Sequence, residues 1–551
     1  MSVQLRIPVE RPDPKGVIYT RQWVVDLILD LVGYRADVDL AAMTAVEPAA
    51  GEGAFLIPMV RRLLESLRRH DRPITDARRA LLAYELDPDA LYAARDLVAQ
   101  ELLDGDVDRR TANRLAKAWL VEGDYLLSAG DAPKADVIVG NPPYIRYDDI
   151  PVDLFASYRS VCQAMVGRCD IYVGFIEAAL KQLRPEGRVG FICADRWMRS
   201  AYGAELRRQI VDGASVDAVI EMHDAPAFED DVSAYPAVVV LRKGVQGPAL
   251  VGSADKRADT PADGSLADAV LDLAAGRRKE VVGFTATTLS EWYRGDTPWP
   301  WAKPEELRVL KWLEARFRPL EDEATGTRVG IGVATGADQV FVTADRSVVE
   351  EDRLLPLAMS ADTRTGELCW SGHYLVNPWN GAGLVDLATY PRFAAYVHRH
   401  RASLQRRNVA MRQEARWYRT IDRVMPGLLE REKLYFPDMK METHPVLDRG
   451  KTYPHHNLYF VTSDSWDLEV LGGLLLSKVA ELFVSSYCVK MRGGTLRFQA
   501  QYLRRIRVPD PAQLSEDVMV RLRDAFRSRD RGAATDAAVE AYGLRELAEL
   551  L

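Results

Sequence analysis

The strongest constraint on the fold is an alternation of apolar runs with longer helical patterns through the first 245 residues. Some runs are almost free of polar residues, as is typical of strands that helices cover on both faces. The strand-like segments are MTAVEPAAGEGAF, ALLAYELD, ADVIVGNPPY, GRVGFICADRW, VDAVIEM and PAVVVLRKG, and helical spacing occupies 55–70, 88–103 and 172–183. This order predicts an α/β fold with a doubly wound, parallel, Rossmann-like sheet, whose ligand sites lie at the carboxyl ends of the strands.

Changes in composition and periodicity divide the rest of the chain. With 551 residues, the chain is too long for one hydrophobic core, so at least two domains are expected. Gly, Ala, Asp and Thr without clear periodicity follow residue 244, which indicates a linker. We therefore expect a first domain at 1–245, a linker at 246–285, a mixed α+β domain at 286–510 and a short helical tail at 511–551.

The overall composition is that of an ordinary soluble protein, with 48% hydrophobic and 28% charged residues. No segment approaches the roughly 18 apolar residues of a membrane-spanning helix, and no signal-peptide pattern begins the sequence. We therefore expect a cytoplasmic protein with no membrane partner. The five cysteines show no CxxC spacing, so neither a disulfide framework nor a zinc site is predicted.

The net charge of −8 hides two basic stretches in the second half of the chain. Residues 391–453 hold fourteen Lys or Arg against seven Asp or Glu, and residues 490–507 hold six basic residues and no acidic one. Aromatic residues are interleaved with these charges, as in RQEARWYRTIDR and MRGGTLRFQAQYLRRIRV. Cations neutralise phosphates and aromatic rings stack on bases, so this mixture favours a nucleic-acid partner over a plain solvated surface.

Three successive strand ends carry residues that suit one adenosine-bearing ligand. Gly51 and Gly53 form a bend between a strand and a helix, where a ligand can approach the backbone closely, and Glu47 just before the bend suits an ammonium group. Glu85 ends the next strand, where an acidic side chain can bind both hydroxyls of a ribose. Asp124 follows a third strand and can accept a hydrogen bond from an exocyclic amine. The order of these residues indicates the ligand more strongly than any one of them.

The segment KADVIVGNPPYIRYDD joins an apolar strand to a stiff, polar turn. Pro142 and Pro143 remove two backbone donors and fix two φ angles, so the carbonyl oxygens of the turn point outward in a fixed arrangement. Such rigidity suits a binding site, although a proline-rich strand terminator is the plain alternative.

Taken in order, these motifs resemble those of the TaqI-like, gamma-class (N-P-P-Y) DNA adenine-N6 methyltransferases. The resemblance is carried by KGVIYTRQWVVDLIL, VEPAAGEGAFL, AYELDPDAL, GDYLL, VGNPPYIRY, DIYVGFIEAALKQLRPEGRVGFICADRW and AFEDDVSAYPAVVVL. Segments 329–342 and 391–462 are more loosely similar to target-recognition regions of this family. The resemblance implies an S-adenosylmethionine-dependent methyltransferase domain, a DNA target-recognition domain at 286–510, and methyl transfer to N6 of an adenine flipped out of duplex DNA.

The resemblance also implies roles for the residues of the rigid turn, Asn141, Pro142, Pro143 and Tyr144, as the catalytic segment. The side-chain oxygen of Asn141 and the backbone carbonyl of Pro142 would accept hydrogen bonds from the N6 amino group. Two acceptors at tetrahedral angles would free the nitrogen lone pair for in-line attack on the methyl group, with no covalent enzyme intermediate. Tyr144 would stack on the extruded base, and Phe228 would lie on its opposite side.

The implied cofactor is S-adenosyl-L-methionine. Its pocket is expected to run from the methionine end to the adenine through Thr20, Glu47, Pro48, Ala49, Gly51, Gly53, Glu85, Asp124, Tyr125 and Phe175. The sequence departs from the usual family pattern at Arg21, Ala50 and Glu52. These departures lie around the expected methionine end and leave the glycines intact.

Other substrates and roles remain as alternatives. Related N-P-P-Y enzymes act on RNA or on a glutamine of a protein, but the long C-terminal half favours duplex DNA, and a cytosine-N4 enzyme more typically has serine in place of Asn141. A DNA-binding subunit of a restriction or phage-defence assembly would not need an intact catalytic segment. No D…ExK nuclease cluster precedes the first motif, so we expect a stand-alone enzyme. We also expect it to be monomeric, bacterial and nucleoid-associated. It would partner a separately encoded restriction endonuclease or act as an orphan.

The second half offers candidate DNA contacts in Arg416, Arg419, Lys440, Arg492 and Arg497. Of these, Arg492 and Arg497 flank a Gly-Gly-Thr sequence and should affect DNA binding more than cofactor binding. His455 and His456 predict a structural or phosphate-facing turn rather than a metal site, because no carboxylate or thiol lies at ligand spacing. No metal is expected for the reaction.

Overall fold

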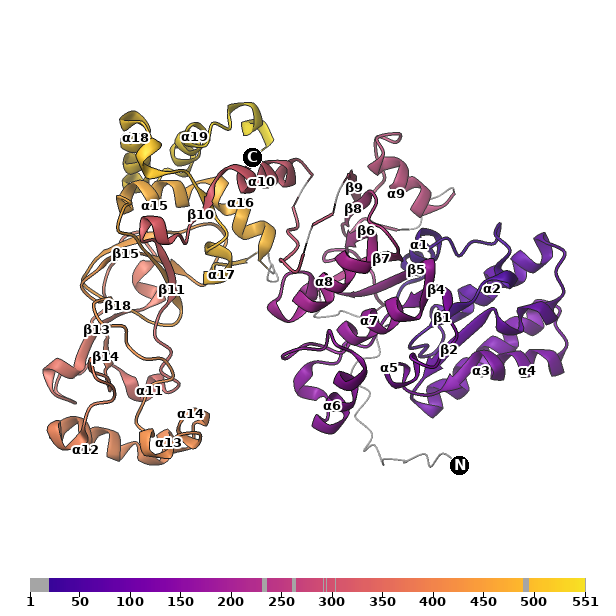
Figure 1. The fold of residues 1–551 in the computed structure, drawn as a ribbon, viewed down its shortest axis with the longest axis horizontal. Coiled ribbons are helices and arrows are strands. Elements are labelled where there is room, and N and C mark those ends of the chain that lie inside the picture. The colour runs from indigo at the N-terminus through magenta and orange to yellow at the C-terminus, as the bar shows by residue number, and fades with distance from the viewer. Residues whose placement is uncertain are drawn as a thin grey trace. The chain divides into compact units, whose positions relative to one another are not determined.

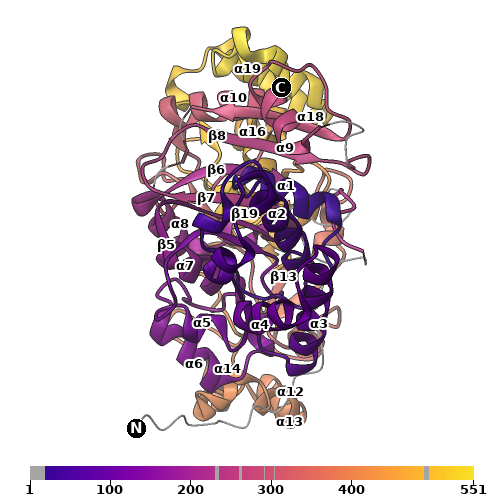
Figure 2. The same cartoon turned by 90° about the vertical axis from the view of Figure 1, so that its right-hand side faces the viewer.

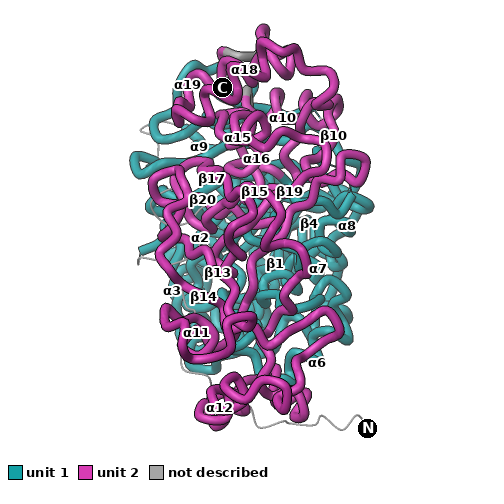
Figure 3. The backbone as a smooth tube through the Cα atoms, turned by 90° about the vertical axis from the view of Figure 1, so that its left-hand side faces the viewer, with its two compact units in different colours: residues 1–299 teal, residues 300–551 magenta. Residues whose placement is uncertain are grey.

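The computed structural model describes residues 19–229, 235–259, 264–290, 292–293, 295–302, 304–488 and 495–550. The chain forms two compact units, Met1–Trp299 and Pro300–Leu551 (Figure 3). No helix within the described ranges is long and apolar enough to span a bilayer.

A nine-stranded sheet forms the centre of the first unit (Figure 1). Its strands follow the order β3-β2-β1-β4-β5-β7-β6-β8-β9. They are β1 (Ala45–Glu47), β2 (Leu81–Glu85), β3 (Leu120–Glu122), β4 (Ala135–Gly140), β5 (Leu183–Ala194), β6 (Ala214–Glu221), β7 (Pro236–Lys243), β8 (Ala249–Ala254) and β9 (Phe284–Leu289). The α/β fold with a large central sheet is confirmed. The expectation of an entirely parallel sheet is wrong, because β7 is antiparallel to both β5 and β6, and β9 to β8.

Helices connect and cover these strands. They are α1 (Gln22–Leu31), α2 (Leu56–Arg69), α3 (Pro88–Asp104), α4 (Arg109–Trp119), α5 (Tyr125–Ser128), α6 (Val152–Val161), α7 (Tyr172–Gln182), α8 (Ala204–Gly213) and α9 (Leu266–Ala274). The apolar face of α1 packs on β4, β5 and β7 and also meets α2 and α9, whereas α7 packs on β5 and α8 on β6. Gly190 of β5 allows the close approach of α1, since a Cβ there would lie 2.6 Å from Val32 Cγ1.

The strand order places the expected motifs at one edge of the sheet. Strands β1 and β4 are adjacent and parallel, with Val46 opposite Ile138. The neighbour of β1 on one side is β2, and the neighbour of β4 on the other side is β5. On its other side β1 pairs with β2, with Glu47 opposite Ala83. The carboxyl ends of β1, β2 and β4 therefore lie side by side at the point where the strand order reverses, which is where open α/β sheets bind ligands.

The linker expected at 246–285 is wrong, because β8 and β9 extend the sheet and α9 covers it. Arg35 holds α9 through a bidentate ion pair with Asp268, with N–O distances of 2.8 and 2.6 Å. Ser265 caps the helix and donates to Asp30 at 2.6 Å. The buried positions of this segment are mostly Ala and Val, whose small apolar contrast hides the period of a strand or helix in the sequence.

The first unit also extends beyond the expected boundaries at 245 and 285. Trp299 donates its backbone N–H to the carbonyl of Met198 at 2.8 Å, and its ring meets that of Trp197 at a centroid distance of 5.2 Å. The Trp292 ring lies 5.2 Å from that of Trp299. These tryptophans, which sequence texture assigns to the second domain, close the core of the first unit.

The second unit contains mixed short sheets, in agreement with the predicted α+β class. Two four-stranded sheets have the orders β11-β19-β15-β17 and β12-β14-β13-β18, and β10-β21 and β16-β20 are two-stranded pairs. The strands are β10 (Arg318–Pro319), β11 (Arg328–Ile331), β12 (Val342–Thr343), β13 (Leu354–Ala358), β14 (Tyr374–Val376), β15 (Glu432–Pro437), β16 (Met439–Lys440), β17 (Val446–Arg449), β18 (Tyr453–Pro454), β19 (Leu458–Thr462), β20 (Leu496–Arg497) and β21 (Arg507–Val508).

Helices gather at both ends of the second unit, with α12, α13 and α14 at one end and α18 and α19 at the other (Figures 1 and 2). They are α10 (Pro304–Arg316), α11 (Asp338–Phe341), α12 (Pro391–Arg399), α13 (Arg401–Gln405), α14 (Asn408–Met411), α15 (Leu468–Leu476), α16 (Lys478–Tyr487), α17 (Ala500–Leu503), α18 (Glu516–Ser528) and α19 (Arg531–Ala541). Both α18 and α19 pack on α15. The segment expected to be a short helical tail is thus helical and belongs to the core of this unit.

The contact between α15 and α18 depends on small residues, which gives a test of how firmly the C-terminal helices are held. We expect Gly473→Ala to lower the free energy of unfolding by roughly 1–3 kcal/mol, the usual cost of overpacking. A Cβ at Gly473 would overlap the backbone carbonyl of Leu522. Gly213→Ala at the end of α8 is the matched control, because nothing lies within 4 Å of a Cβ there. Equal midpoints of thermal unfolding for the two variants would contradict the close packing.

Candidate active site

The bend after β1 brings two strand ends together. Gly51 and Gly53 have φ angles of +51° and +94°, in the left-handed region that glycine adopts without strain. The Ala50 N–H donates to the carbonyl of Tyr84 at 2.8 Å, and the Gly51 N–H donates to Glu85 Oε2 at 2.7 Å. The bend is therefore fixed to the end of β2 by one backbone and one side-chain hydrogen bond.

Glu85 acts as a cross-link at this edge of the sheet. Its Oε1 accepts hydrogen bonds from the N–H groups of Leu86 and Asp87, both at 2.8 Å, in addition to the bond from Gly51 to Oε2. These three donors hold the carboxylate in place. Because a carboxylate oxygen can accept two hydrogen bonds, Oε2 keeps capacity for a ligand hydroxyl.

Glu47 carries a buried carboxyl group. It is 1% exposed, and its Oε2 has no hydrogen-bond partner within the described residues. Burial, and then the charge of Glu85, raise the pKa of Glu47 well above its usual range, while the N–H groups of Phe55 and Leu56 act in the opposite direction. A positively charged ligand group beside Glu47 would stabilise its ionised form and offset the cost of burial.

Aromatic side chains form a wall beside Asp124, where the adenine of the ligand is expected. Asp124 caps α5, and its Oδ2 accepts a hydrogen bond from the Tyr158 hydroxyl at 2.6 Å. The rings of Tyr125 and Phe175 lie with centroids 5.5 Å apart at 32°, and the Tyr125 hydroxyl donates to Gln182 at 2.9 Å. A ligand amine at Asp124 would share Oδ2 with Tyr158. Sequence reasoning missed Tyr158, because nothing in the surrounding pattern distinguishes it from other helix tyrosines.

Asn141 directly follows β4 and contacts the N-terminal segment. Its Nδ2 donates to Thr20 Oγ1 at 3.3 Å. Thr20 in turn forms a β-bridge with Phe228, and Arg21 donates to the carbonyls of Ala227 and Phe228, each at 3.0 Å. The structure thus brings together residues that lie far apart in the sequence: the expected catalytic segment, the expected methionine-end threonine and the expected stacking aromatic. Arg21, which departs from the usual pattern, has a structural role in this pairing.

The two aromatic residues expected to enclose a base meet edge to face. The rings of Tyr144 and Phe228 have centroids 6.3 Å apart and an interplanar angle of 86°. A base cannot stack flat on both rings in this arrangement, so one ring must rotate to sandwich it. The Tyr144 hydroxyl is buried without a hydrogen-bond partner among the described residues, and burial raises the pKa of Tyr144 well above its usual range. The ring therefore stays neutral.

The basic residues proposed as DNA contacts differ in how they are held. Arg497 forms a bidentate ion pair with Asp438, and Arg419 donates to Gln413 at 2.9 Å and to the carbonyls of Thr420 and Ile421, both at 3.2 Å. Arg416 is exposed in a short turn and Lys440 ends the small strand β16. Arg492 lies outside the described residues.

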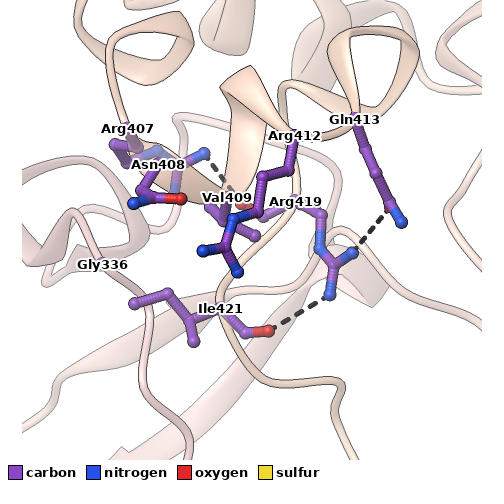
Figure 4. Close-up of a pocket in the computed structure, with 8 residues that line it drawn as sticks. All are labelled: Gly336, Arg407, Asn408, Val409, Arg412, Gln413, Arg419 and Ile421. Carbon is purple, nitrogen blue, oxygen red and sulfur yellow. Dashed lines mark hydrogen bonds between the residues drawn. The ribbon is translucent and has the colours of Figure 1, made fainter. Parts of the chain in front are cut away.

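Of these candidate contacts, Arg419 lines a cavity of about 610 Å³ (Figure 4). It is lined by Gly336, Arg407, Asn408, Val409, Arg412, Gln413, Arg419 and Ile421. The guanidinium of Arg407 donates hydrogen bonds to backbone carbonyls, including those of Thr335 at 3.0 Å and Arg419 at 2.8 Å. Arg412 extends into the cavity, and within the described part of the chain its guanidinium has no hydrogen-bond or ion-pair partner. Sequence reasoning missed Arg412, since its neighbours have the same composition.

The sheet with antiparallel strands β7 and β9, the glycine bend and the Asn-Pro-Pro-Tyr turn agree with the expectation of an S-adenosylmethionine-dependent methyltransferase. Residues 88–228 match the family model of the Eco57I restriction-modification methylase. The fold is also similar to that of the type IIL restriction-modification enzyme MmeI, solved in complex with DNA, with a TM-score of 0.58 and 12% identity over 96% of this chain and 72% of that chain.

Sequence relatives define the family. The chain is 41% identical to the type II methyltransferase M.XhoI of Xanthomonas vasicola, over 97% of this chain and 98% of that protein. It is 42% identical to the type II methyltransferase M.PaeR7I of Pseudomonas aeruginosa, over 97% of this chain and 92% of that protein. The chain belongs to the type II DNA methyltransferases of restriction-modification systems, and its cofactor is S-adenosyl-L-methionine.

The residues at the sheet edge fit this cofactor. S-adenosyl-L-methionine has an ammonium group, a positive sulfonium, a ribose and an adenine. The edge supplies a buried carboxyl at Glu47, a fixed carboxylate at Glu85 and the aromatic wall at Tyr125 and Phe175. The backbone bend at Gly51 is open, since nothing lies within 4 Å of a Cβ built there.

Glu47 provides a test in which stability and binding change in opposite directions. Its folded-state pKa is raised, so stability is lost as pH rises above the unfolded value of about 4.3. We expect Glu47→Gln to raise the thermal midpoint of the ligand-free protein at pH near 8, and this gain should shrink toward about pH 4. The same variant should bind S-adenosylmethionine more than about tenfold less tightly in calorimetry.

Glu52→Gln is the matched control, because Glu52 is exposed in the same bend. A Glu47→Gln protein with unchanged stability and unchanged cofactor affinity would show that the buried carboxyl does not face the ligand.

Proposed function

We propose that the chain transfers a methyl group from S-adenosylmethionine to N6 of an adenine flipped out of duplex DNA, as an enzyme of the gamma-class, N-P-P-Y type. The supporting observation is the position of Asn141: at the carboxyl end of β4, next to the bend after β1, with its amide held by Thr20. Aromatic rings at Tyr144 and Phe228 lie in the same region of the unit.

The proposed chemistry depends on positioning and not on proton transfer from a titrating side chain. When bound, the cofactor supplies an electrophilic sulfonium methyl group. The Asn141 amide is oriented by its Nδ2 contact with Thr20, which leaves Oδ1 as the end that would accept from the N6 amino group. The Pro142 carbonyl would accept the second N–H. Because Pro142 and Pro143 fix the turn, both acceptors are preorganised before the base arrives.

The residues at the sheet edge would hold the cofactor. Glu47 would face its cationic methionine end, with Thr20, Pro48, Ala49, Gly51 and Gly53 around it. Glu85 would accept from the ribose through Oε2, and Asp124, Tyr125 and Phe175 would line the adenine. Occupation of Asp124 by Tyr158 means that adenine binding displaces or shares that hydroxyl.

Base flipping would require a local rearrangement. Tyr144 and Phe228 are perpendicular, so rotation of one ring would open a slot in which the base stacks. The buried, unpaired Tyr144 hydroxyl would gain a partner or solvent during this movement, which lowers its cost.

The second unit would supply the DNA contacts. Its cavity presents the cation of Arg412, which has no partner among the described residues, beside Arg407 and Arg419, which donate to the protein itself. A cation without an internal partner neutralises a DNA phosphate at no cost in broken ion pairs, so Arg412 is the best-suited contact in this region. We further propose a monomeric, nucleoid-associated enzyme that protects sites cut by a separately encoded endonuclease.

The catalytic proposal is tested by Asn141→Ala. We expect loss of methyl transfer to duplex DNA by more than about a hundredfold, as for removal of one preorganised polar contact in a transition state. Cofactor affinity should change little, because the amide would contact the base. The measurement is transfer of labelled methyl groups, with methylation-aware sequencing to identify the modified base. Methylated cytosine in place of adenine would contradict the proposal, as would undiminished transfer.

Substitutions of Thr20 test whether its hydroxyl positions the amide of Asn141. Thr20→Ser keeps the hydroxyl that Asn141 contacts, whereas Thr20→Val keeps the shape and removes it. Positioning through this contact predicts a lower kcat for the valine variant with unchanged DNA affinity, and near-normal kcat for the serine variant. Equal activity of both variants would remove Thr20 from the argument.

Arg412 has no partner among the described residues and Arg497 is paired with Asp438, so the two can be compared as DNA contacts. We expect Arg412→Ala to weaken DNA binding and to reduce the slope of log affinity against log salt by about one, the signature of one lost phosphate contact. Arg497→Ala should give a smaller loss, because its guanidinium is paired with Asp438. Cofactor affinity should be unchanged in both. Fluorescence anisotropy over a salt series measures the slopes, and the reverse order of the two variants would refute the assignment.

A further inference from the structure

A group of two histidines and one aspartate in the second unit has no role in the proposed methyl transfer. His455 Nε2 lies 3.1 Å from Asp338 Oδ2 and 3.1 Å from His456 Nδ1. The three potential ligand atoms all lie within 4.8 Å of one another. Asp338 is far from the histidines in sequence, which is why the spacing of His455 and His456 alone predicts no metal site.

We propose that Asp338, His455 and His456 bind a divalent first-row transition-metal ion such as Zn²⁺. Two imidazoles and a carboxylate are ligands that such ions share. The two nitrogens lie 3.1 Å apart. With an ion about 2.1 Å from each, the nitrogen–ion–nitrogen angle would be about 95°, close to octahedral geometry. Asp338 is 47% exposed, so water can complete the coordination and the ion can enter from solvent.

Hydrogen bonding alone does not satisfy this arrangement. Only one hydrogen can occupy His455 Nε2, and both the Asp338 carboxylate and His456 Nδ1 face that atom. If Nε2 lacks the hydrogen, its lone pair opposes a carboxylate. If it carries the hydrogen, two acceptors compete for it. His455 is buried, and its Nδ1 has no partner within the described residues to fix the tautomer. A cation would accept all three lone pairs at once.

The ligands are held by rigid surroundings. Thr335, which is fully buried, donates to Asp338 Oδ1 and so leaves Oδ2 for an ion. The backbone N–H groups of His455 and His456 donate to Ala358 at 3.0 Å and Val333 at 3.1 Å. Ordered supporting contacts of this kind orient metal ligands and limit the entropy lost on binding. The ion would tie the start of α11 to the turn after β18, and the loop just before α11 contributes Gly336 to the arginine cavity.

A second group of similar composition shows what a charge-compensated network looks like. In the first unit His223 contacts Asp195 at 3.0 Å and Glu221 at 2.5 Å, and Arg199 contacts Asp195 at 3.1 Å. Burial alone would lower the pKa of His223, but its hydrogen bonds to Asp195 and Glu221 raise that pKa to about 9. That group already holds two cations against two carboxylates. Within the described residues no arginine contacts the group in the second unit, so its three potential ligand atoms face one another without a compensating cation.

The test is metal binding by the full chain after treatment with a chelator. We expect one equivalent of Zn²⁺ to bind and to raise the thermal midpoint, and Co²⁺ to give visible d–d absorption bands at the same stoichiometry. Asp338→Asn and His456→Ala should each weaken Zn²⁺ binding by more than about tenfold. His70→Ala, an exposed histidine of the first unit, should bind as the unaltered chain does.

Three results would overturn the proposal: no stoichiometric binding of either ion, equal binding by the His456→Ala and unaltered chains, or loss of DNA affinity in His456→Ala with no metal bound to either chain. The last would identify a phosphate-facing turn instead. Because the readouts are affinity, stability and absorption, they are independent of whether the chain methylates adenine.

Discussion

The carboxylate of Glu85 is the interaction on which the site depends. Three backbone N–H groups converge on it, one from the bend after β1 and two from the start of the connection after β2. It thereby sets the path of Gly51 at the point where the strand order reverses. Burial raises the pKa of Glu47, and the charge of Glu85 adds to that shift, so Glu85 contributes to both the shape and the electrostatics of this edge.

A cost in stability follows from this arrangement. Within the described residues, a buried carboxyl oxygen of Glu47 and the buried hydroxyl of Tyr144 have no hydrogen-bond partner. Buried polar groups without partners are unfavourable, and they persist where a ligand supplies the missing contact. The two groups belong to neighbouring strand ends of β1 and β4, so the unsatisfied atoms are concentrated where a methyl donor and its acceptor would meet.

Sequence reasoning predicts what depends on local spacing and misses what depends on distant contacts. Strong apolar runs locate β1, β2 and β4, and the glycine bend and Asn-Pro-Pro-Tyr turn follow from them. The segment 246–285 is misread because Ala-rich strands and helices lack contrast, although α9 is anchored by Arg35. The partner of Asp124 is Tyr158 and the partner of His455 is Asp338, and neither pairing has a signal in the spacing of residues.

The second unit shows why a count of basic residues overstates a nucleic-acid interface. Lys433 is fully buried and pairs with Asp448 at 2.9 Å, and Arg407 serves backbone carbonyls. Such cations stabilise the fold and have no charge left to offer a phosphate. An internal partner must be given up before an arginine can bind DNA, which removes much of the gain. The fraction of cations without internal partners, and not the net charge of a stretch, therefore sets how strongly this surface can attract a polyanion.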